Sequence, residues 1–190
     1  MSDLRLGDKV GFIGLGNMGW PMACHLQDAG AELIVWNRSE AKSRMAAERG
    51  MLVATDSETV ADAVESGIVC LNLSHSDVVE SIVDAMLPGL REGTLIVDFG
   101  TTGFETTKRL ADVVAEKGAS WLDAPVSGGQ VGAEAANLTI MVGGEEESFQ
   151  RAEAIFNVVG NKVTLLGPCG SGQVAKLANQ MIVAQTIDAV

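Results

Sequence analysis

The fold is decided by Lys9-Val-Gly-Phe-Ile-Gly14-Leu15-Gly16-Asn17-Met18-Gly19, near the start of the chain. The apolar run 9–13 predicts a buried strand, and 17–29 has the pattern of a helix, so the glycines fall in a strand-to-helix turn. In such a turn the first glycine permits a tight bend, the second lets the backbone approach a pyrophosphate, and the third allows close helix packing. Free amides at the start of the helix then hold the anion. The stretch therefore predicts a dinucleotide site made of Gly14, Leu15, Gly16, Asn17, Met18 and Gly19; the alternative is a tight turn without a ligand.

Short apolar runs alternate with helix-patterned segments along the rest of the chain. Strands are expected at 9–13, 32–36, 68–72, 94–98, 120–122, 138–142 and 162–165. Helices are expected at 17–29, 39–49, 76–86, 104–116, 145–158 and 173–190, with Ser39 and Ser76 as N-caps. This alternation predicts an α/β fold of the Rossmann type, with a doubly wound, mostly parallel sheet and helices on both faces. The last pattern reaches residue 190 without a stop signal, which we interpret as the start of a long interdomain helix.

Composition and charge exclude several classes of partner. The chain has 190 residues, 47% of them hydrophobic, and a formal net charge of -12. That length and hydrophobic content can bury one good core, so we expect one main domain. An acidic protein gains little from nucleic-acid phosphates or anionic lipids, so we expect no nucleic acid and no membrane as partners. No run has the length of a membrane span and residues 1–6 lack a signal-peptide pattern, which predicts a soluble, cytoplasmic protein.

Cysteine and histidine residues are few and scattered. Cys24, Cys70 and Cys169 are typical of reduced, structural thiols. His25 and His75 lie far apart in the sequence, and no ligand cluster has zinc-like spacing. We therefore expect chemistry without a metal ion.

The end of the second expected strand bears on the choice of dinucleotide. An acidic side chain there would bind a free ribose hydroxyl and repel a phosphate, but this chain has Asn37-Arg38-Ser39. The guanidinium group of Arg38 can bind a phosphate, so NADP is favoured over NAD, with Asn37 and Ser39 as further contacts. The alternative is that Arg38 is a solvated cation paired with Glu40 or Asp56.

Two other strand ends face the same crevice in a doubly wound sheet. Leu73 and Ser74 follow one of these strands, and Thr101 follows the other. Their hydroxyl and backbone groups are candidates for binding the ribose or the nicotinamide amide. His75 could serve as an acid–base group, but a histidine just before a helix is more often a loop residue.

A second glycine-rich motif, Asp123-Ala-Pro-Val-Ser127-Gly128-Gly129, indicates a strand end and a bend. The Ser127 hydroxyl and the amides of Gly128 and Gly129 could hold a carboxylate without a formal charge. An ordinary turn is the alternative.

The third motif spans 167–179 and ends in a helix that carries Lys176 and Asn179. A lysine that is partly desolvated in a cleft changes readily between its charged and neutral forms, so it can exchange a proton with a carbonyl or hydroxyl oxygen. Asn179 and Gln180 return to the same helix face three and four residues later. A solvated surface lysine is the alternative, but the neighbours of Lys176 in the sequence are apolar.

Together these motifs resemble the β-hydroxyacid dehydrogenase family, which includes 3-hydroxyisobutyrate dehydrogenases, tartronate semialdehyde reductases and, more distantly, 6-phosphogluconate dehydrogenase. The resemblance covers nearly the whole chain and rests on three motifs in order, at 14–26, 123–133 and 167–179. It implies that Ser127, Gly128 and Gly129 bind a small carboxylic acid, that Lys176 is the acid–base residue, and that Asn179 or its neighbour assists.

The resemblance also implies a domain organisation. Residues 1–166 would form the dinucleotide-binding domain, and 167–190 the catalytic loop and the start of the interdomain helix. Family members continue into an all-helical C-terminal domain that completes the pocket and the dimer. We expect that domain to be absent from this chain, and the full-length form to be a homo-oligomer. Met181, Ile182 and Ile187 would then form an exposed apolar face.

These observations predict an NADP-dependent oxidoreductase that interconverts a small β-hydroxy acid and its semialdehyde, with Lys176 as proton donor and acceptor. One alternative is a dinucleotide-binding module or truncated fragment without catalysis. Another is an imine reductase; that group resembles this family, but its members usually lack the lysine.

Overall fold

The computed structural model describes residues 9–188, with side chains as far as residue 186. The N-terminal residues, where no signal peptide is expected, and the side chain of Ile187 lie outside the described residues. The strands are β1 (Lys9–Ile13), β2 (Glu32–Trp36), β3 (Leu52–Val53), β4 (Ile68–Leu71), β5 (Leu95–Asp98), β6 (Ser120–Asp123), β7 (Val126–Ser127), β8 (Leu138–Gly143) and β9 (Gly160–Gly167). The helices are α1 (Gly19–Asp28), α2 (Glu40–Glu48), α3 (Ser57–Ala63), α4 (Ser76–Met86), α5 (Phe104–Ala115), α6 (Gly129–Glu134), α7 (Glu146–Val159) and α8 (Ser171–Asp188).

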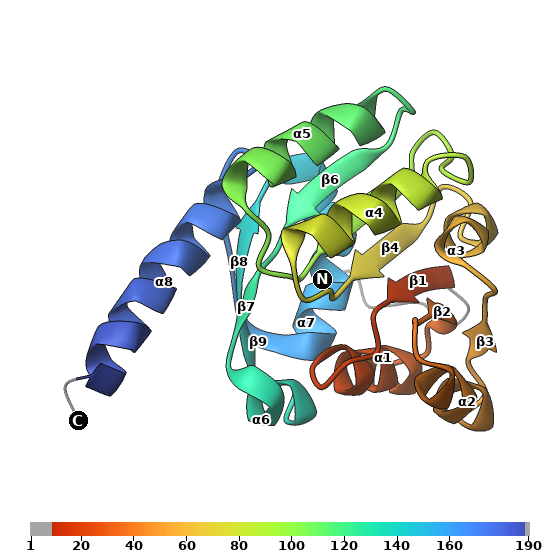
Figure 1. Ribbon diagram of the computed structural model, residues 1–190, viewed down its shortest axis with the longest axis horizontal. Coiled ribbons are helices and arrows are strands. Elements are labelled where there is room, and N and C mark those ends of the chain that lie inside the picture. Colours follow the sequence, from red (N-terminus) through yellow and green to blue (C-terminus); the bar gives the residue numbers. More distant parts are fainter. Residues whose placement is uncertain (1–8, 189–190) are drawn as a thin grey trace.

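The strands form one mostly parallel sheet (Figure 1). Strands β3, β2, β1, β4, β5 and β6 lie side by side in that order, and all five pairings between them are parallel. Strand β8 runs antiparallel to β6 and β7 and parallel to β9. The order reverses at β1, and a doubly wound sheet binds ligands beyond the carboxyl ends of its strands at such a point. The predicted Rossmann-type fold is confirmed.

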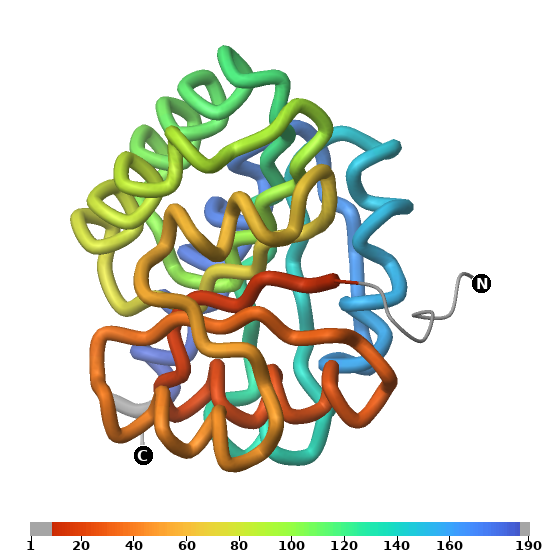
Figure 2. Tube along the Cα trace, turned by 90° about the vertical axis from the view of Figure 1, so that its right-hand side faces the viewer, coloured from red at the N-terminus to blue at the C-terminus, as the bar shows by residue number. Residues whose placement is uncertain are grey.

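Helices cover both faces of the sheet, as Figure 2 shows for α4 and α5 on one side and α7 on the other. Successive strand residues point to opposite faces, so Phe12 belongs to the core under α1 and α7, and Ile13 to the core under α3, α4 and α5. Both side chains are fully buried. The central strands β1, β4 and β5 are mostly apolar because both of their faces are covered.

Four short elements were missing from the sequence prediction: β3, α3, β7 and α6. Helix α3 begins after Asp56, whose carboxylate accepts the Thr59 N–H at 2.7 Å, a capping signal that the sequence interpretation did not use. The cap expected at Ser76 is wrong by one residue, because His75 is the N-cap of α4. Ser39 is the N-cap of α2, but its side chain makes no capping hydrogen bond.

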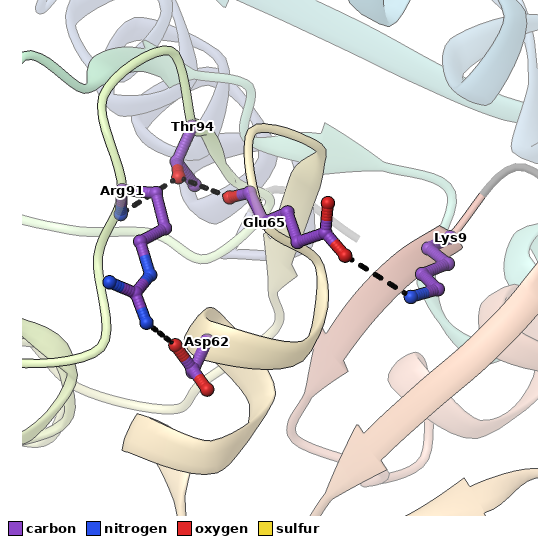
Figure 3. Close-up of polar contacts among 5 residues, drawn as sticks. All are labelled: Lys9, Asp62, Glu65, Arg91 and Thr94. Carbon is purple, nitrogen blue, oxygen red and sulfur yellow. Dashed lines mark hydrogen bonds and ion pairs between the residues drawn. The ribbon is translucent and has the colours of Figure 1, made fainter.

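Polar contacts join the loops at the amino ends of the strands (Figure 3). Lys9 Nζ lies 3.5 Å from Glu65 Oε1, and Arg91 pairs with Asp62 at the end of α3. The Thr94 hydroxyl donates to the Glu65 carbonyl at 2.8 Å. Such exposed ion pairs stabilise a fold only slightly. These contacts connect α3 to the start of β5 and leave the opposite edge, where the motif residues lie, free to form a site.

Helix α8 leaves the edge of the sheet and extends away from the body of the fold (Figure 1). As expected, Met181 and Ile182 on this helix are exposed, at 60% and 65%. Across residues 9–188, no helix combines the length and the apolar character that crossing a membrane would require.

Candidate active site

The glycine turn between β1 and α1 has two glycines that the fold requires and one that it does not. Gly14 has a φ of +100°, and a Cβ there would lie 2.3 Å from the Asn72 carbonyl oxygen. A Cβ on Gly19 would lie 1.9 Å from the Gly14 carbonyl oxygen. At Gly16, by contrast, a Cβ would have no protein atom within 4 Å. The bare backbone at Gly16 therefore faces open space, which fits the close approach of a ligand.

The start of α1 is also suited to an anion. Met18 is the N-cap but makes no side-chain capping bond, and the first turn contains no acidic residue. No side chain caps its amides, although the Trp20 N–H donates to the Gly16 carbonyl oxygen at 3.0 Å, and the positive end of the helix dipole favours a negative ligand. The amide of Leu15 is an exception, because it donates to Asn37 Oδ1 at 2.9 Å, and the Leu15 side chain is fully buried. Asn17 is exposed beside this helix end.

Two clefts adjoin at Gly16. The first, of about 260 Å³, is lined by Gly14, Gly16, Trp36, Asn37, Arg38, Asn72, Leu73, Ser74, Val78 and Ile82. It brings together the glycine turn, the residues after β2 and those after β4, as predicted for a crevice beyond the strand ends. Arg38 is exposed and has no carboxylate within ion-pair distance among the described residues, so it does not form the ion pair with Glu40 or Asp56 that was the alternative. Ser39 is exposed too but does not line this cleft.

The second cleft, of about 330 Å³, contains a cation that the sequence interpretation missed. Lys42 lines it together with Gly16, Asn17 and Trp20, and Lys42 Nζ lies 5.7 Å from the centre of the Trp20 ring. Lys42 lies in the first turn of α2, four residues after Arg38, which precedes the N-cap Ser39. Because Arg38 is outside the helix, helical spacing does not relate the two cations, and no local pattern marks Lys42.

The loop after β5 is held by a buried carboxylate. Asp98 Oδ1 accepts the Gly100 N–H at 2.9 Å, and Asp98 Oδ2 accepts the Thr102 hydroxyl at 2.6 Å. Burial raises the pKa of Asp98 to about 7, and the nearby charge of Asp123 contributes in the same direction. Thr101 is exposed at the tip of this loop, where the sequence placed a cofactor contact.

The loop after β6 carries the predicted carboxylate cradle. Ser127 is half-buried in the short strand β7, opposite Thr139 of β8. Gly128 and Gly129 are exposed and have φ values of +136° and +61°, a backbone conformation that glycine adopts without strain. Ser127 lies on β7 and Lys176 on α8, and within the part of the chain that is described no hydrogen bond joins them.

Lys176 is the most unusual cation of the described residues. Lys176 is only 8% exposed, and among residues 9–188 no carboxylate lies within ion-pair distance of its ammonium group. Burial lowers the pKa of Lys176 from the ordinary lysine value. One turn later on the helix, the buried amide nitrogen of Asn179 has no hydrogen-bond partner. A desolvated ammonium group and a free amide donor are costly to folding, so their occurrence on one helix face indicates a site that binds polar groups.

Asp123 and Gln173 form a part of the site that the sequence interpretation missed. Asp123 is fully buried, and its carboxylate accepts the Gly170 N–H at 2.7 Å and the Gln173 N–H at 2.9 Å. Burial raises the pKa of Asp123, although these amides oppose the shift. The Gln173 side chain in turn binds the loop after β5. These contacts join residues about 50 and 70 positions apart, which no local pattern reveals.

The remaining candidates give no sign of chemistry. Cys70 is buried, and burial raises its pKa; burial also raises the pKa of Cys169 to about 12. His25 contacts the Glu134 carbonyl oxygen at 3.0 Å through Nε2. Among the described residues, no three His, Cys, Asp or Glu side chains are grouped so that they could hold a metal ion.

Comparison with known proteins gives the family. Residues 9–167 match the family described as the NAD binding domain of 6-phosphogluconate dehydrogenase. The 2-hydroxy-3-oxopropionate reductase of Escherichia coli is 41% identical over 186 residues, which are 96% of this chain and 62% of the relative. The 2-(hydroxymethyl)glutarate dehydrogenase of Eubacterium barkeri is 36% identical over 177 residues, which are 92% of this chain and 58% of the relative. The chain therefore spans about three fifths of the length of these curated relatives.

Solved structures agree with this result. The 3-hydroxyisobutyrate dehydrogenase of Mycobacterium tuberculosis, determined with L-serine, superposes with a TM-score of 0.89 at 32% identity. The match covers 94% of this chain and 60% of that one. Imine reductases share the fold at 20–25% identity.

Proposed function

Because this chain belongs to the β-hydroxyacid dehydrogenase family, we propose that it takes part in the NADP-dependent interconversion of a small β-hydroxy acid and its semialdehyde. The observation that carries the proposal is Lys176, a buried ammonium group without an ion pair in the described residues, one turn from the unpartnered Asn179 amide. The relatives named for hydroxy acids are 36–41% identical to this chain, whereas the imine reductases are at 20–25%. This difference favours hydroxyacid chemistry over imine reduction.

The dinucleotide would be held by the clefts at the glycine turn. The bare backbone of Gly16 and the positive end of the α1 dipole suit its pyrophosphate. Arg38 suits a ribose phosphate, with Lys42 as a second cation at the same edge. Leu73, Ser74 and Thr101 would contact the rest of the molecule, which supplies hydride transfer when bound.

Lys176 would manage the proton. Its ammonium group gives a proton to the carbonyl oxygen of the semialdehyde as that oxygen gains negative charge, and in the opposite direction its neutral amine accepts the proton of the hydroxyl group. The Asn179 amide would donate a hydrogen bond that orients this oxygen, and the loop of Ser127, Gly128 and Gly129 would hold the carboxylate of the substrate. We propose a homo-oligomer for the intact protein, in which further residues complete the pocket.

The first test addresses the dinucleotide site. In Gly16→Ala we expect the free energy of unfolding to stay within about 0.5 kcal/mol of wild type, because the added methyl group meets no protein atom. NADPH affinity should fall roughly tenfold or more, since the methyl group fills the space where the backbone meets the ligand; tenfold corresponds to about 1.4 kcal/mol. Calorimetric titration and urea unfolding measure the two quantities. Unchanged NADPH affinity would show that nothing binds at Gly16.

The contrasting variant is Gly19→Ala. Its added Cβ would overlap the Gly14 carbonyl oxygen, so the turn must shift and stability should fall. Equal stability losses in both variants would mean that Gly16 is also a structural residue.

The second test addresses coenzyme preference. In Arg38→Ala we expect NADPH affinity to fall roughly 10- to 100-fold, because a charge-assisted hydrogen bond contributes about 1.5–3 kcal/mol. NADH has no phosphate at this position, so its affinity should change little. Arg44→Ala is a matched control, since Arg44 is exposed on the same helix, α2, but does not line the cleft. Equal losses for NADPH and NADH would contradict a phosphate-binding role.

A further inference from the structure

Gln173 joins the first turn of α8 to the loop that follows β5. Its Nε2 donates to the Gly100 carbonyl at 3.0 Å, and its Oε1 accepts the Thr102 N–H at 3.1 Å. The residue is only 4% exposed. Both ends of the amide group are therefore used, and a carboxylate or an apolar side chain of the same length could not make this pair of hydrogen bonds.

The backbone of the same turn is fixed to the next strand. The N–H groups of Gln173 and Gly170 donate to the carboxylate of Asp123, at the end of β6. Asp98 is the register partner of Asp123 on β5 and holds the other side of the loop through the Gly100 N–H. The start of α8 and the loop 100–102 therefore belong to one buried hydrogen-bonded unit.

This unit links two groups that the proposed function brings to the reaction. Thr101 is exposed on the loop, where the cofactor would bind, and Lys176 lies three residues after Gln173 on α8. If the helix moved relative to the loop, the distance between the proton donor and the bound cofactor would change. A misplacement of 1 Å in an active site can lower the rate by about 100-fold.

We propose that Gln173 is a positioning residue that sets the distance between Lys176 and the cofactor loop, so that it controls the rate of turnover and leaves cofactor affinity nearly unchanged. The inference rests on the proposed function. The inference goes beyond the proposed function because it assigns the alignment of Lys176 and the cofactor loop to a side chain that touches neither substrate nor cofactor.

The test is made in the intact protein. Gln173→Met keeps the length of the side chain but removes both hydrogen bonds. We expect kcat to fall roughly 10- to 100-fold, while KM and the Kd for NADPH change by less than about threefold. Gln185→Met is the matched control, because Gln185 is exposed farther along α8. An equal loss in the control, or a parallel loss of NADPH affinity, would overturn the proposal.

A second variant tests the hydrogen-bond pair if the methionine variant does not fold. In Gln173→Glu the buried carboxyl group should have a raised pKa, and its protonated form again offers one donor and one acceptor. We therefore expect the ratio of its kcat to the wild-type kcat to rise as the pH falls. A ratio that does not depend on pH would count against the role of this pair.

Failure of the proposed function would give a different result. The wild-type protein itself would then neither bind NADPH nor convert any semialdehyde acid. In that case one part of the inference can still be tested, namely that Gln173 holds the buried turn that carries Lys176. The pKa of Lys176, followed by NMR after ¹³C-methylation of the lysine amines, is the measurement. We expect Gln173→Met to raise this pKa, because water reaches the loosened turn, and Gln185→Met to leave it unchanged; an unchanged pKa in Gln173→Met would overturn the inference.

Discussion

Replacing Lys176 with methionine should lower kcat by a factor of roughly 10² to 10⁴, the usual contribution of a positioned proton donor. Affinity for NADPH should change little, because Lys176 lines neither of the clefts at the glycine turn. The folded protein should be as stable as wild type or more stable, since the change removes a buried charge without an ion pair in the described residues. Steady-state kinetics, calorimetry and thermal unfolding measure the three effects.

Two variants sharpen this result. Lys176→Arg keeps the positive charge but cannot release a proton, so it should also lose turnover. Lys117→Met removes an exposed lysine after α5 and should leave turnover unchanged. Because burial lowers the pKa of Lys176, semialdehyde reduction should decline as the pH rises through that lowered pKa, and oxidation should increase over the same range. Turnover retained in Lys176→Met would rule it out as the proton donor.

Asp98→Asn should make the protein more stable at pH 8. The folded pKa of Asp98 is about 7, above the ordinary value of 3.8, so between these two values the folded state binds more protons than the unfolded state. The free energy of unfolding should therefore fall as the pH rises from about 4 to about 7. An asparagine has no charge to bury, and the Thr102 hydroxyl can reverse and accept from it. At about 1.4 kcal/mol per pKa unit, we expect a gain of about 2–4 kcal/mol at pH 8 and little change at pH 5, measured by urea unfolding.

Asp123→Asn provides the opposite case. Both carboxylate oxygens of Asp123 accept from backbone N–H groups, which cannot reverse. An amide NH₂ would leave one of these donors unpaired, which costs about 1–3 kcal/mol. We therefore expect Asp123→Asn to destabilise the protein at pH 5 and at pH 8. A gain in stability at pH 8 for both variants would mean that the loss of any negative charge stabilises this acidic protein, and that burial of Asp98 is not the specific cause.

The central fold could be predicted because its determinants are local. Residues 10–13 are apolar and buried, as a strand covered on both faces requires, and the glycines after them mark the turn by their spacing. Lys176 and Asn179 could be paired for the same reason, since three residues make nearly one helical turn. The missed elements are short: β3 has two residues and α3 has seven, too few for periodicity to be decisive.

The hydrogen-bonded unit beneath the site could not be predicted from the sequence. Gln173 reads as a polar residue at the start of a helix, and its role depends on Gly100, 73 positions earlier. Asp98 and Asp123 are the last residues of their strands, a position from which a carboxylate is expected to face solvent or a ligand. Only the register that sets β5 beside β6 makes them buried neighbours.

The contacts of Asn37 and Arg38 have a consequence for protein engineering. The Asn37 side chain is committed to the protein itself, because its oxygen accepts the Leu15 amide and its nitrogen donates to the Ser39 carbonyl at 3.3 Å. Arg38, by contrast, is exposed and makes no ion pair in the part of the chain that is described. Mutant libraries designed to change coenzyme preference should therefore vary position 38 freely and keep position 37 fixed. If Arg38 holds the phosphate as proposed, a change of coenzyme starts at an exposed position whose replacement requires no compensating change in the core.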